Sequence, residues 1–263
     1  MELDDAYDNL GHIPGGAEFP PRWDSDAKSY RAAFRASGRL KEHLSYGASG
    51  RARYDLFLPR SDPAGLAIFV HGGYWRRFDH RVWSHFSAGP VARGWAVAIP
   101  SYDLCPTVRI SDITRQIAAM ITKSAGDTDG PIVLFGHSAG GHLVARMTAP
   151  GLLPETVARR IGRITPISPV ADLRPLMRTS MNVDFRLTED EARAESPVLT
   201  SDRLASQVHV WVGADERPAF LEQARWLSDA WQCPLRIAPG RHHLNVIDDL
   251  ADPQSALTSD ILG

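Results

Sequence analysis

The sequence predicts an α/β fold, in which a mostly parallel central sheet is flanked by helices, with an antiparallel N-terminal hairpin and a small helical cap. Three observations support this prediction. Short segments that are apolar throughout recur along the 263-residue chain, as buried parallel strands require. Amphipathic segments of helical length separate them. One apolar segment also runs directly into a glycine-flanked serine and then into a helical pattern, which indicates a strand-to-helix junction.

The apolar segments indicate where five strands lie. They are LAIFV at residues 66–70, WAVAIP at 95–100, PIVLF at 131–135, VHVWV at 208–212 and the weaker LRIA at 235–238. Helices are expected at residues 81–93, 110–124, 138–149 and 219–231, with a last helix from about residue 246. Alternation of strands and helices implies crossover connections on a mostly parallel sheet that is covered on both faces.

Three segments lie outside this alternation. Before the first parallel strand, HLSYG and RARYDLFLP flank Ala-Ser-Gly and alternate polar with apolar residues, which predicts the antiparallel hairpin. Residues 168–206 are rich in proline, arginine and acids, so we expect a helical excursion over one end of the sheet. Residues 1–38 include the turn-rich GHIPGGAEFPPRW and are expected to form a surface segment or part of a lid. We therefore expect one domain over residues 1–263.

Charge and composition exclude several classes of function. Lys plus Arg is 29 against 31 for Asp plus Glu, and this formal net charge of -2 gives no field that would attract nucleic acid or an anionic membrane. The N-terminal MELDDAYDNL is acidic where a secretory signal is cationic, and no apolar segment approaches the ~18 residues of a membrane span. We expect a cytoplasmic protein that acts on a small-molecule substrate, and the sequence leaves homo-oligomerisation open.

The strongest catalytic pattern lies in PIVLFGHSAGGHLVARM. Gly136-His137-Ser138-Ala139-Gly140 has the form G-x-S-x-G, follows a predicted strand and opens a predicted helix. In that setting a sharp turn holds the serine in a strained conformation with its hydroxyl exposed. Side chains at positions 136 and 140 would collide with the strand and helix beside the turn. We predict that Ser138 is a nucleophile; the alternative is a turn that only reverses the chain.

A second motif, VHGGYW, directly follows the strand at residues 66–70. Loops in this position supply oxyanion-hole amides, and glycines there let backbone N–H groups approach a substrate oxygen. We assign the oxyanion hole to the amides of Gly73, Tyr74 and Ala139. The last of these opens a helix, whose N-terminus favours negative charge. His71 is expected to brace the loop through a hydrogen bond rather than to act in catalysis.

A base and an orienting acid are expected later in the chain, in the order nucleophile, acid, base. VHVWVGADERPAF places Asp215 and Glu216 directly after a strand, and APGRHHLNVIDDL places His242 and His243 after the weaker one. We predict that His243 is the base, because the Leu-Asn-Val-Ile that follows begins a helical pattern that would fix its backbone. The local residues leave the acid open between Asp215 and Glu216.

Four motifs together resemble the arylformamidases, or kynurenine formamidases, of the α/β-hydrolase superfamily. They are GHSAG, HGGYW, YDLCP at residues 102–106 and ERPAF at residues 216–220. HGGYW is the specific element, because most related esterases and lipases carry a third glycine where this chain has Tyr74. The resemblance runs from about residue 60 onward. It implies an α/β-hydrolase fold and the hydrolysis of N-formyl-kynurenine to kynurenine and formate in tryptophan catabolism, with no metal and no cofactor.

The resemblance also bears on the acid and on the substrate pocket. In the family, the acid is the third residue after a strand-ending glycine and is separated from Pro-x-Phe by one residue, which points to Glu216, although an aspartate would be expected there. The predicted triad is therefore Ser138, Glu216 and His243. Tyr74 and Trp75 are candidates for the wall of an aromatic pocket, with anchoring of the loop as the alternative. A carboxylesterase acting on small acyl esters would use the same residues, whereas a non-enzymatic member would be expected to lose one of the three.

Overall fold

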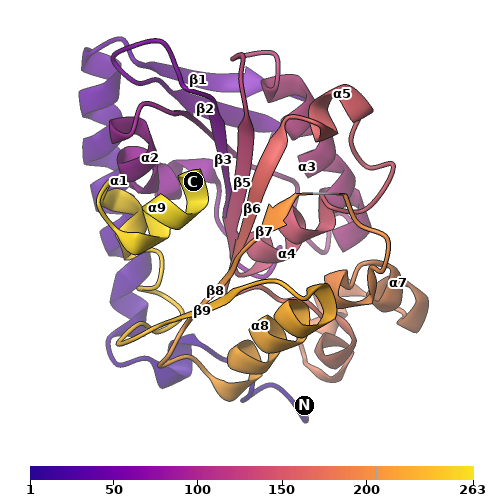
Figure 1. The fold of residues 1–263 in the computed structure, drawn as a ribbon. Coiled ribbons are helices and arrows are strands. Elements are labelled where there is room, and N and C mark those ends of the chain that lie inside the picture. The colour runs from indigo at the N-terminus through magenta and orange to yellow at the C-terminus, as the bar shows by residue number, and fades with distance from the viewer. Residues whose placement is uncertain (205) are drawn as a thin grey trace.

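A computed structural model describes residues 1–204 and 206–263, and its central sheet lies between two groups of helices (Figure 1). In the described part of the chain, nine strands form one sheet in the order β1-β2-β4-β3-β5-β6-β8-β9, with β7 paired to β6. The strands are β1 (Leu40–Ser45), β2 (Arg53–Phe57), β3 (Leu66–Val70), β4 (Ala96–Pro100), β5 (Ile132–His137), β6 (Ile161–Ile167), β7 (Gln207–Val208), β8 (Val210–Gly213) and β9 (Leu235–Ala238). The hairpin of β1 and β2 is antiparallel and joins β4, and the pairs from β4 to β9 are parallel, which confirms the predicted fold class.

Two hydrophobic clusters hold helices on the two faces of the sheet, because alternate strand residues point in opposite directions. Ala67 and Phe69 of β3 pack with α1, α2 and α9, whereas Leu66, Ile68 and Val70 pack with α3, α4 and α8. These helices are α1 (Phe19–Ala36), α2 (Ala88–Ala92), α3 (Ile110–Ser124), α4 (Ala139–Arg146), α8 (Pro218–Trp231) and α9 (Ala256–Leu262). Figure 1 shows the two groups on either side of the sheet.

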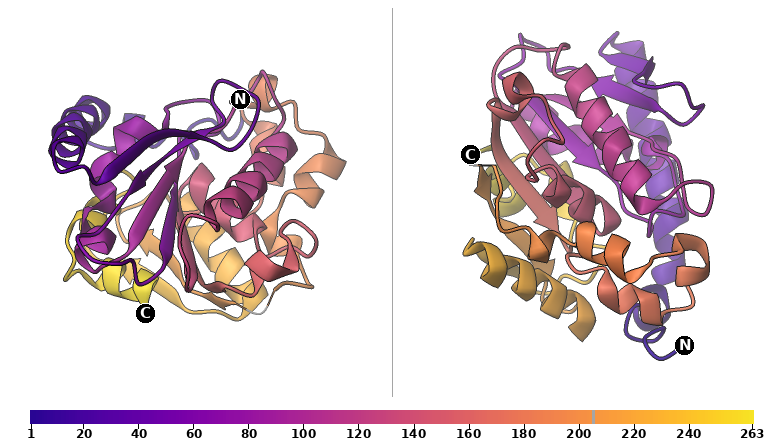
Figure 2. Two further views of the ribbon diagram at one scale, coloured as in Figure 1. Left: turned by 90° about the horizontal axis from the view of Figure 1, so that it is seen from above. Right: turned by 90° about the vertical axis from the view of Figure 1, so that its right-hand side faces the viewer.

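Short helices form the predicted cap and the remaining connections. The cap contains η4 (Arg174–Arg178), α6 (Asn182–Phe185), α7 (Glu189–Ala194) and η5 (Pro197–Leu199). The other short helices are η1 (Leu10–His12), η2 (Gly16–Glu18), η3 (His80–Ser87), α5 (Glu155–Ala158) and η6 (Asp248–Ala251). Figure 2 shows the cap helices near the N-terminus, where the Leu3 amide donates to the Arg178 carbonyl oxygen at 3.3 Å. Residue 205, which belongs to the excursion predicted at residues 168–206, lies outside the described residues.

The helix α1 differs from the prediction, which treated residues 1–38 as a turn-rich surface segment. Its prolines lie in the first turn, where the missing N–H has no helical partner in any case. Its buried face is formed at helical spacing by Trp23, Ala27, Arg31 and Phe34. The segment before α1 contains only short 3₁₀ helices, in keeping with its glycines and with Pro14.

The second half of the sheet also departs from the prediction. The strand β6 was not predicted, because Gly162, Arg163 and Pro166 interrupt its apolar pattern, yet it pairs with β5 in the middle of the sheet. The strand expected at residues 208–212 is divided at His209 into β7 and β8. The last helix, expected from about residue 246, is replaced by η6 and α9.

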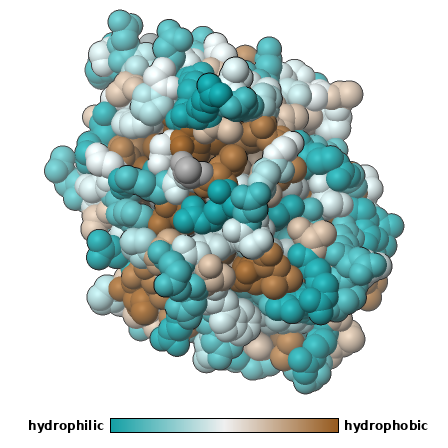
Figure 3. Space-filling view, turned by 45° about the vertical axis from the view of Figure 1, so that its right-hand side comes forward, coloured by the Kyte–Doolittle hydropathy of each residue, from teal (hydrophilic) through white to brown (hydrophobic). Residues whose placement is uncertain are grey.

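No helix within the described ranges combines the length and apolar character that a membrane crossing needs. The surface turned toward the viewer in Figure 3 interleaves hydrophobic areas with hydrophilic side chains.

Candidate active site

Ser138 lies at the junction of β5 and α4 with φ of 57° and ψ of -118°, a conformation that is costly for a residue other than glycine. The flanking glycines make this turn sterically feasible. A Cβ atom on Gly140 would lie 1.9 Å from the Val70 carbonyl oxygen, and one on Gly136 would lie 2.3 Å from the Gly140 carbonyl oxygen. Although Ser138 is the N-cap residue of α4, its hydroxyl makes no capping hydrogen bond. The hydroxyl is therefore available to the cavity that Ser138 lines.

His243 follows β9 and lines the same cavity as Ser138. Its side chain is 5% exposed, and its Nδ1 lies 2.7 Å from Oε2 of Glu216. Because a carboxylate accepts hydrogen bonds, this contact places the imidazole proton on Nδ1. The Nε2 atom is then the nitrogen that can accept a proton from a serine hydroxyl.

Glu216, not Asp215, is the acid that reaches His243. Its side chain has no exposed surface, and its other carboxylate oxygen, Oε1, accepts hydrogen bonds from the Ser168 hydroxyl at 2.5 Å and the Gly213 amide at 2.8 Å. Asp215 is exposed. A Cβ on Gly213 would lie 3.2 Å from Cγ of Glu216 and 2.1 Å from the Arg241 carbonyl oxygen. The glycine therefore leaves room for the longer glutamate side chain.

The loop after β3 presents backbone amides beside this serine. Gly73, Tyr74 and Trp75 all have positive φ, at 110°, 51° and 54°. The amides of Arg76 and Arg77 both donate to the Gly73 carbonyl oxygen, which closes the turn. Within the described residues, the amides of Gly73, Tyr74 and Ala139 donate to no backbone carbonyl outside regular helices and strands. The three predicted oxyanion-hole amides are therefore available to a ligand.

Close packing fixes this loop against the serine turn. A Cβ on Gly72 would lie 2.9 Å from the His137 carbonyl oxygen and 3.0 Å from Cβ of Ser138. His71 is fully buried, its Nδ1 lies 2.7 Å from the Gly72 carbonyl oxygen, and its ring stacks on Tyr102 at 4.5 Å between centroids. Burial lowers the pKa of His71 to about 3, so the ring is neutral near pH 7. His71 therefore braces the loop, as the sequence predicted.

His137 supports the loop that carries His243. Its Nε2 donates to the carbonyl oxygen of His243 at 2.8 Å, and the two rings lie 4.7 Å apart between centroids. Burial, reinforced by the charge of His243, lowers the pKa of His137 well below its ordinary value. A neutral His137 can hold the backbone of the base without competing for its proton. This role could not be predicted from the sequence, because no local pattern connects residues 137 and 243.

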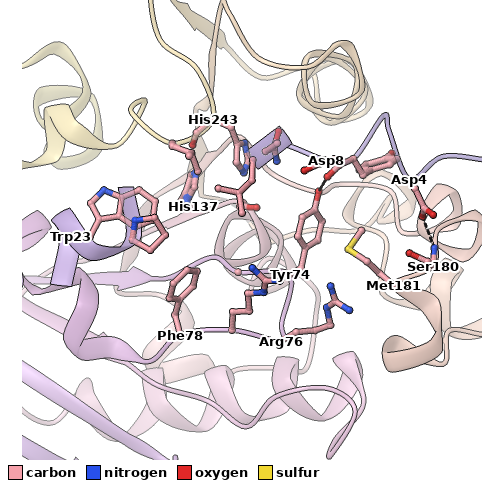
Figure 4. Close-up of a pocket in the computed structure, with 18 of the residues that line it drawn as sticks. Asp4, Asp8, Trp23, Tyr74, Arg76, Phe78, His137, Ser180, Met181 and His243 are labelled. Atoms are coloured by element: carbon pink, nitrogen blue, oxygen red, sulfur yellow. Dashed lines mark hydrogen bonds between the residues drawn. The ribbon is translucent and has the colours of Figure 1, made fainter. Parts of the chain in front are cut away.

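The cavity has a volume of about 440 Å³ and two chemically different ends. Figure 4 shows Trp23 and Phe78 at one end and Asp4, Asp8 and Ser180 at the other, with His243 and Tyr74 between them. The lining residues are Asp4, Asp5, Tyr7, Asp8, Asn9, Leu10, Pro20, Trp23, Gly73, Tyr74, Arg76, Arg77, Phe78, Trp83, His137, Ser138, Ser180, Met181, His243 and Leu244. The N-terminal segment, α1, the glycine loop and the cap all contribute to this wall.

Hydrogen bonds tie the N-terminal segment to the rest of the cavity wall. The Tyr74 hydroxyl donates to the Tyr7 carbonyl oxygen at 2.7 Å, which joins this segment to the loop after β3. The Ser180 amide donates to Asp4 Oδ1 at 2.6 Å, which joins it to the cap. The sequence predicted a lid-like role for this segment but did not identify these contacts.

The prediction that Trp75 lines the substrate pocket is wrong. Its side chain is fully buried and is not part of the cavity wall. The ring packs edge-to-face against His142 at 5.1 Å and Phe185 at 5.6 Å between centroids. The sharp turn at residues 73–75 directs successive side chains to different places, so Tyr74 reaches the cavity while Trp75 anchors the loop in the core.

One group of side chains has a spacing that could hold a metal ion. In the described part of the chain, ligand atoms of His43, Asp55 and His80 lie within 4.8 Å of one another. None of the three lines the cavity. Asp55 is ion-paired with the guanidinium group of Arg31, whose positive charge opposes a cation at the same oxygen. Asp55 with Arg31 and His80 is therefore better described as a buried ion-pair cluster beside the exposed His43, and metal-independent catalysis stays a prediction.

Comparisons with known proteins show the family to which the chain belongs. Residues 67–260 match the sequence model of the alpha/beta hydrolase family. The kynurenine formamidase of Salmo salar is 28% identical over 238 residues, which cover 84% of this chain and 80% of that protein. The kynurenine formamidase of Drosophila melanogaster is also 28% identical, over 81% of this chain and 78% of that protein.

Two solved structures extend the comparison. A candidate thioesterase from Silicibacter sp. TM1040 is 55% identical, with a TM-score of 0.98 and coverage of 100% of both chains. Esterase B from Lactobacillus rhamnosis has a TM-score of 0.67 at 15% identity, covers 91% of this chain and 92% of that chain, and shows likeness of fold alone.

Proposed function

Since the chain belongs to the α/β-hydrolase family, we propose that it is a metal-independent serine hydrolase that converts N-formyl-kynurenine to kynurenine and formate. The main support for the serine mechanism is the hydrogen bond between Nδ1 of His243 and the buried carboxylate of Glu216. His243 also lines the same cavity as the strained Ser138. The formamide substrate is supported by the kynurenine formamidases, which align with more than four-fifths of the chain.

In the proposed mechanism, Nε2 of His243 takes the proton of Ser138 as the serine oxygen attacks the formyl carbonyl carbon. The amides of Gly73, Tyr74 and Ala139 hold the tetrahedral oxyanion. His243 then gives its proton to the departing aryl amine. Water, activated by the same imidazole, hydrolyses the formyl-enzyme and releases formate. Glu216 stabilises the imidazolium and keeps its orientation.

The two ends of the cavity also support an aromatic amino-acid leaving group. Kynurenine carries an aryl ring and, on its side arm, one ammonium and one carboxylate group. Trp23 and Phe78 offer aromatic surface for the ring at one end. Asp8 and Arg76 also line the cavity and supply charges of opposite sign for the side arm. Arg76 is also ion-paired with Asp184, and a simple acyl ester offers no charge to either Asp8 or Arg76.

Hydrolysis of an ester or thioester is the second candidate function, favoured by the 55% identical candidate thioesterase. It would use the same catalytic residues. The test is a side-by-side measurement of kcat/KM for N-formyl-kynurenine, p-nitrophenyl acetate, p-nitrophenyl butyrate and an acyl thioester. We expect N-formyl-kynurenine to be the best substrate. A preference of more than tenfold for any ester or thioester would reverse the order of the two proposals.

The serine mechanism has its own test, which does not depend on the identity of the substrate. Replacing Ser138 with alanine should lower kcat by on the order of 10⁴ or more, as loss of a triad member generally does, while circular dichroism shows a folded protein. A serine-directed phosphonate should label the wild type at Ser138 and leave Ser138→Ala unlabelled. Full activity in the alanine variant would rule out this mechanism.

A further inference from the structure

Ser168 is a buried residue outside the predicted triad that contacts its acid. It follows the last residue of β6 and has no exposed surface. Its amide donates to the Trp211 carbonyl oxygen at 2.6 Å, and its hydroxyl donates to Oε1 of Glu216 at 2.5 Å. Ser168 thus connects the end of β6 to the acid that follows β8.

The backbone conformation of Ser168 would favour glycine, which indicates that the serine hydroxyl has a role at this position. Its φ of 48° lies in the left-handed region, which glycine adopts easily and other residues adopt at a cost. Backbone geometry alone would therefore favour glycine here. Strain of this kind persists where the surrounding structure gains something from the side chain, and at Ser168 that side chain contacts Glu216.

The hydrogen bonds of Glu216 show what the hydroxyl contributes. Oε1 accepts from Ser168 and from the Gly213 amide, whereas Oε2 faces Nδ1 of His243. A glutamate has one more rotatable bond than an aspartate, and the torsion of its terminal carboxylate is broad. Two donors on Oε1 restrict that rotation and keep the second oxygen on the histidine. They also compensate the desolvation of a carboxylate that has no exposed surface.

From these contacts we propose that Ser168 is a positioning residue for catalysis, which acts through Glu216 to fix the tautomer and orientation of His243. This inference rests on the proposed serine hydrolase function. Without the hydroxyl, Oε1 keeps only the Gly213 amide, and the carboxylate can turn away from Nδ1. Ser168→Ala should therefore lower kcat roughly 10- to 100-fold, the loss expected for one hydrogen bond to a charged group, and leave KM within about twofold.

The experiment compares Ser168→Ala with Ser168→Gly in the hydrolysis of p-nitrophenyl acetate, with thermal unfolding measured in parallel. Both variants lack the hydroxyl, but glycine relieves the positive φ and should be the more stable. We expect the two variants to lose kcat equally despite their different stabilities. Wild-type kcat in the glycine variant would mean that the alanine variant suffers from strain, and the inference would be wrong.

A double-mutant cycle then tests whether Ser168 acts through Glu216. In the Glu216→Gln background, Ser168→Ala should cost less than about threefold in kcat, because the interaction it removes is already lost. An equal cost in both backgrounds would overturn the inference. The variant Ser138→Ala distinguishes a failure of this inference from a failure of the proposed serine hydrolase function. If Ser138→Ala is inactive and Ser168→Ala is normal, only the role of Ser168 fails, whereas an active Ser138→Ala enzyme removes the proposed function and this inference together.

Discussion

Two adjacent acids, Asp215 and Glu216, follow β8, and their surroundings assign them different roles. Glu216 is buried between Gly213, Ser168 and His243, whereas Asp215 is exposed. An exposed carboxylate interacts weakly with a charge that forms inside the protein, because water screens it. The orientation of His243 therefore depends on one specific carboxylate and not on the acidity of the segment as a whole.

The matched amide variants Glu216→Gln and Asp215→Asn test this difference. Glu216→Gln should lower kcat by on the order of 10³ to 10⁴, because an amide can favour the wrong imidazole tautomer. Asp215→Asn should cost less than about tenfold. Steady-state kinetics of the two purified variants against wild type provides the measurement. A dead asparagine variant beside a nearly normal glutamine variant would transfer the role to Asp215.

The residues that the structure brings together were predictable where chemistry restricts both residue type and local spacing. Ser138 lies in a five-residue motif, and Glu216 and His243 each follow a predicted strand. The contacts of Ser168 and Trp23 could not be predicted, because they depend on how distant segments meet. Trp75 was misplaced for a related reason, since neighbours in a turn with positive φ point in different directions.

The turn between β5 and α4 depends on close contact with β3, and the glycines on that contact are difficult to replace. Gly140→Ala would bring a methyl group against backbone atoms of Val70, which cannot move without displacing β3. We expect a loss of at least about 3 kcal/mol in the free energy of unfolding, measured by urea denaturation. Gly162 of β6 is the matched control, because a Cβ there meets nothing within 4 Å and should change stability by less than about 0.5 kcal/mol. Equal stability of the two variants would contradict this account of the turn.

The contact between the N-terminal segment and the loop after β3 can be tested through Tyr74. Tyr74→Phe removes the hydrogen bond to the Tyr7 carbonyl oxygen but keeps the ring and the backbone amide. We expect KM for N-formyl-kynurenine to rise roughly three- to tenfold, as loss of one hydrogen bond in the wall allows, with kcat within about threefold. Tyr46→Phe is the control, because its hydroxyl donates to the Ser101 carbonyl oxygen and Tyr46 does not line the cavity. A similar rise in both variants would show that the effect is not specific to the N-terminal segment.

The elements themselves were predicted unevenly, for physical reasons. Strands β3 and β4 and the first four residues of β5 are apolar throughout because both of their faces are covered, and such segments are recognisable without context. Strand β6 occupies an equally central place, but its proline and charged residue are accommodated by neighbours that the sequence does not reveal. The exposed face of helix α1 mixes charged residues with serine and alanine, and one of its four buried residues is Arg31, so the apolar pattern of this helix is weak.

The protein as a whole buries several neutral histidines, and this should make its stability depend strongly on pH. Burial lowers the pKa of His71 to about 3 and that of His142 to about 4, and it places that of His137 well below its ordinary value. In the unfolded chain these side chains take up protons below about pH 6.5. The unfolded state therefore binds more protons than the native state between about pH 6.5 and 4, so the free energy of unfolding decreases as the pH falls through this interval.

The buried histidines and the ion-paired carboxylates change the free energy of unfolding in different pH ranges. Three histidines that stay neutral in the native state can together lower the free energy of unfolding by up to about 4 kcal/mol per pH unit below pH 6, against a typical total of about 5 to 15 kcal/mol. The pKa values of Asp55 and Asp79 are about 2, because hydrogen bonds and ion pairs outweigh their burial. These carboxylates therefore lose their contribution to the free energy of unfolding only below about pH 4.

Urea denaturation at pH 7.5, 6.0 and 5.0 should show a steep loss of stability. In the variant His142→Gln the slope should be smaller by up to about 1.4 kcal/mol per pH unit, because one of the three titrations is absent. Stability that stays constant down to pH 4.5 would mean that these histidines become protonated in the native protein.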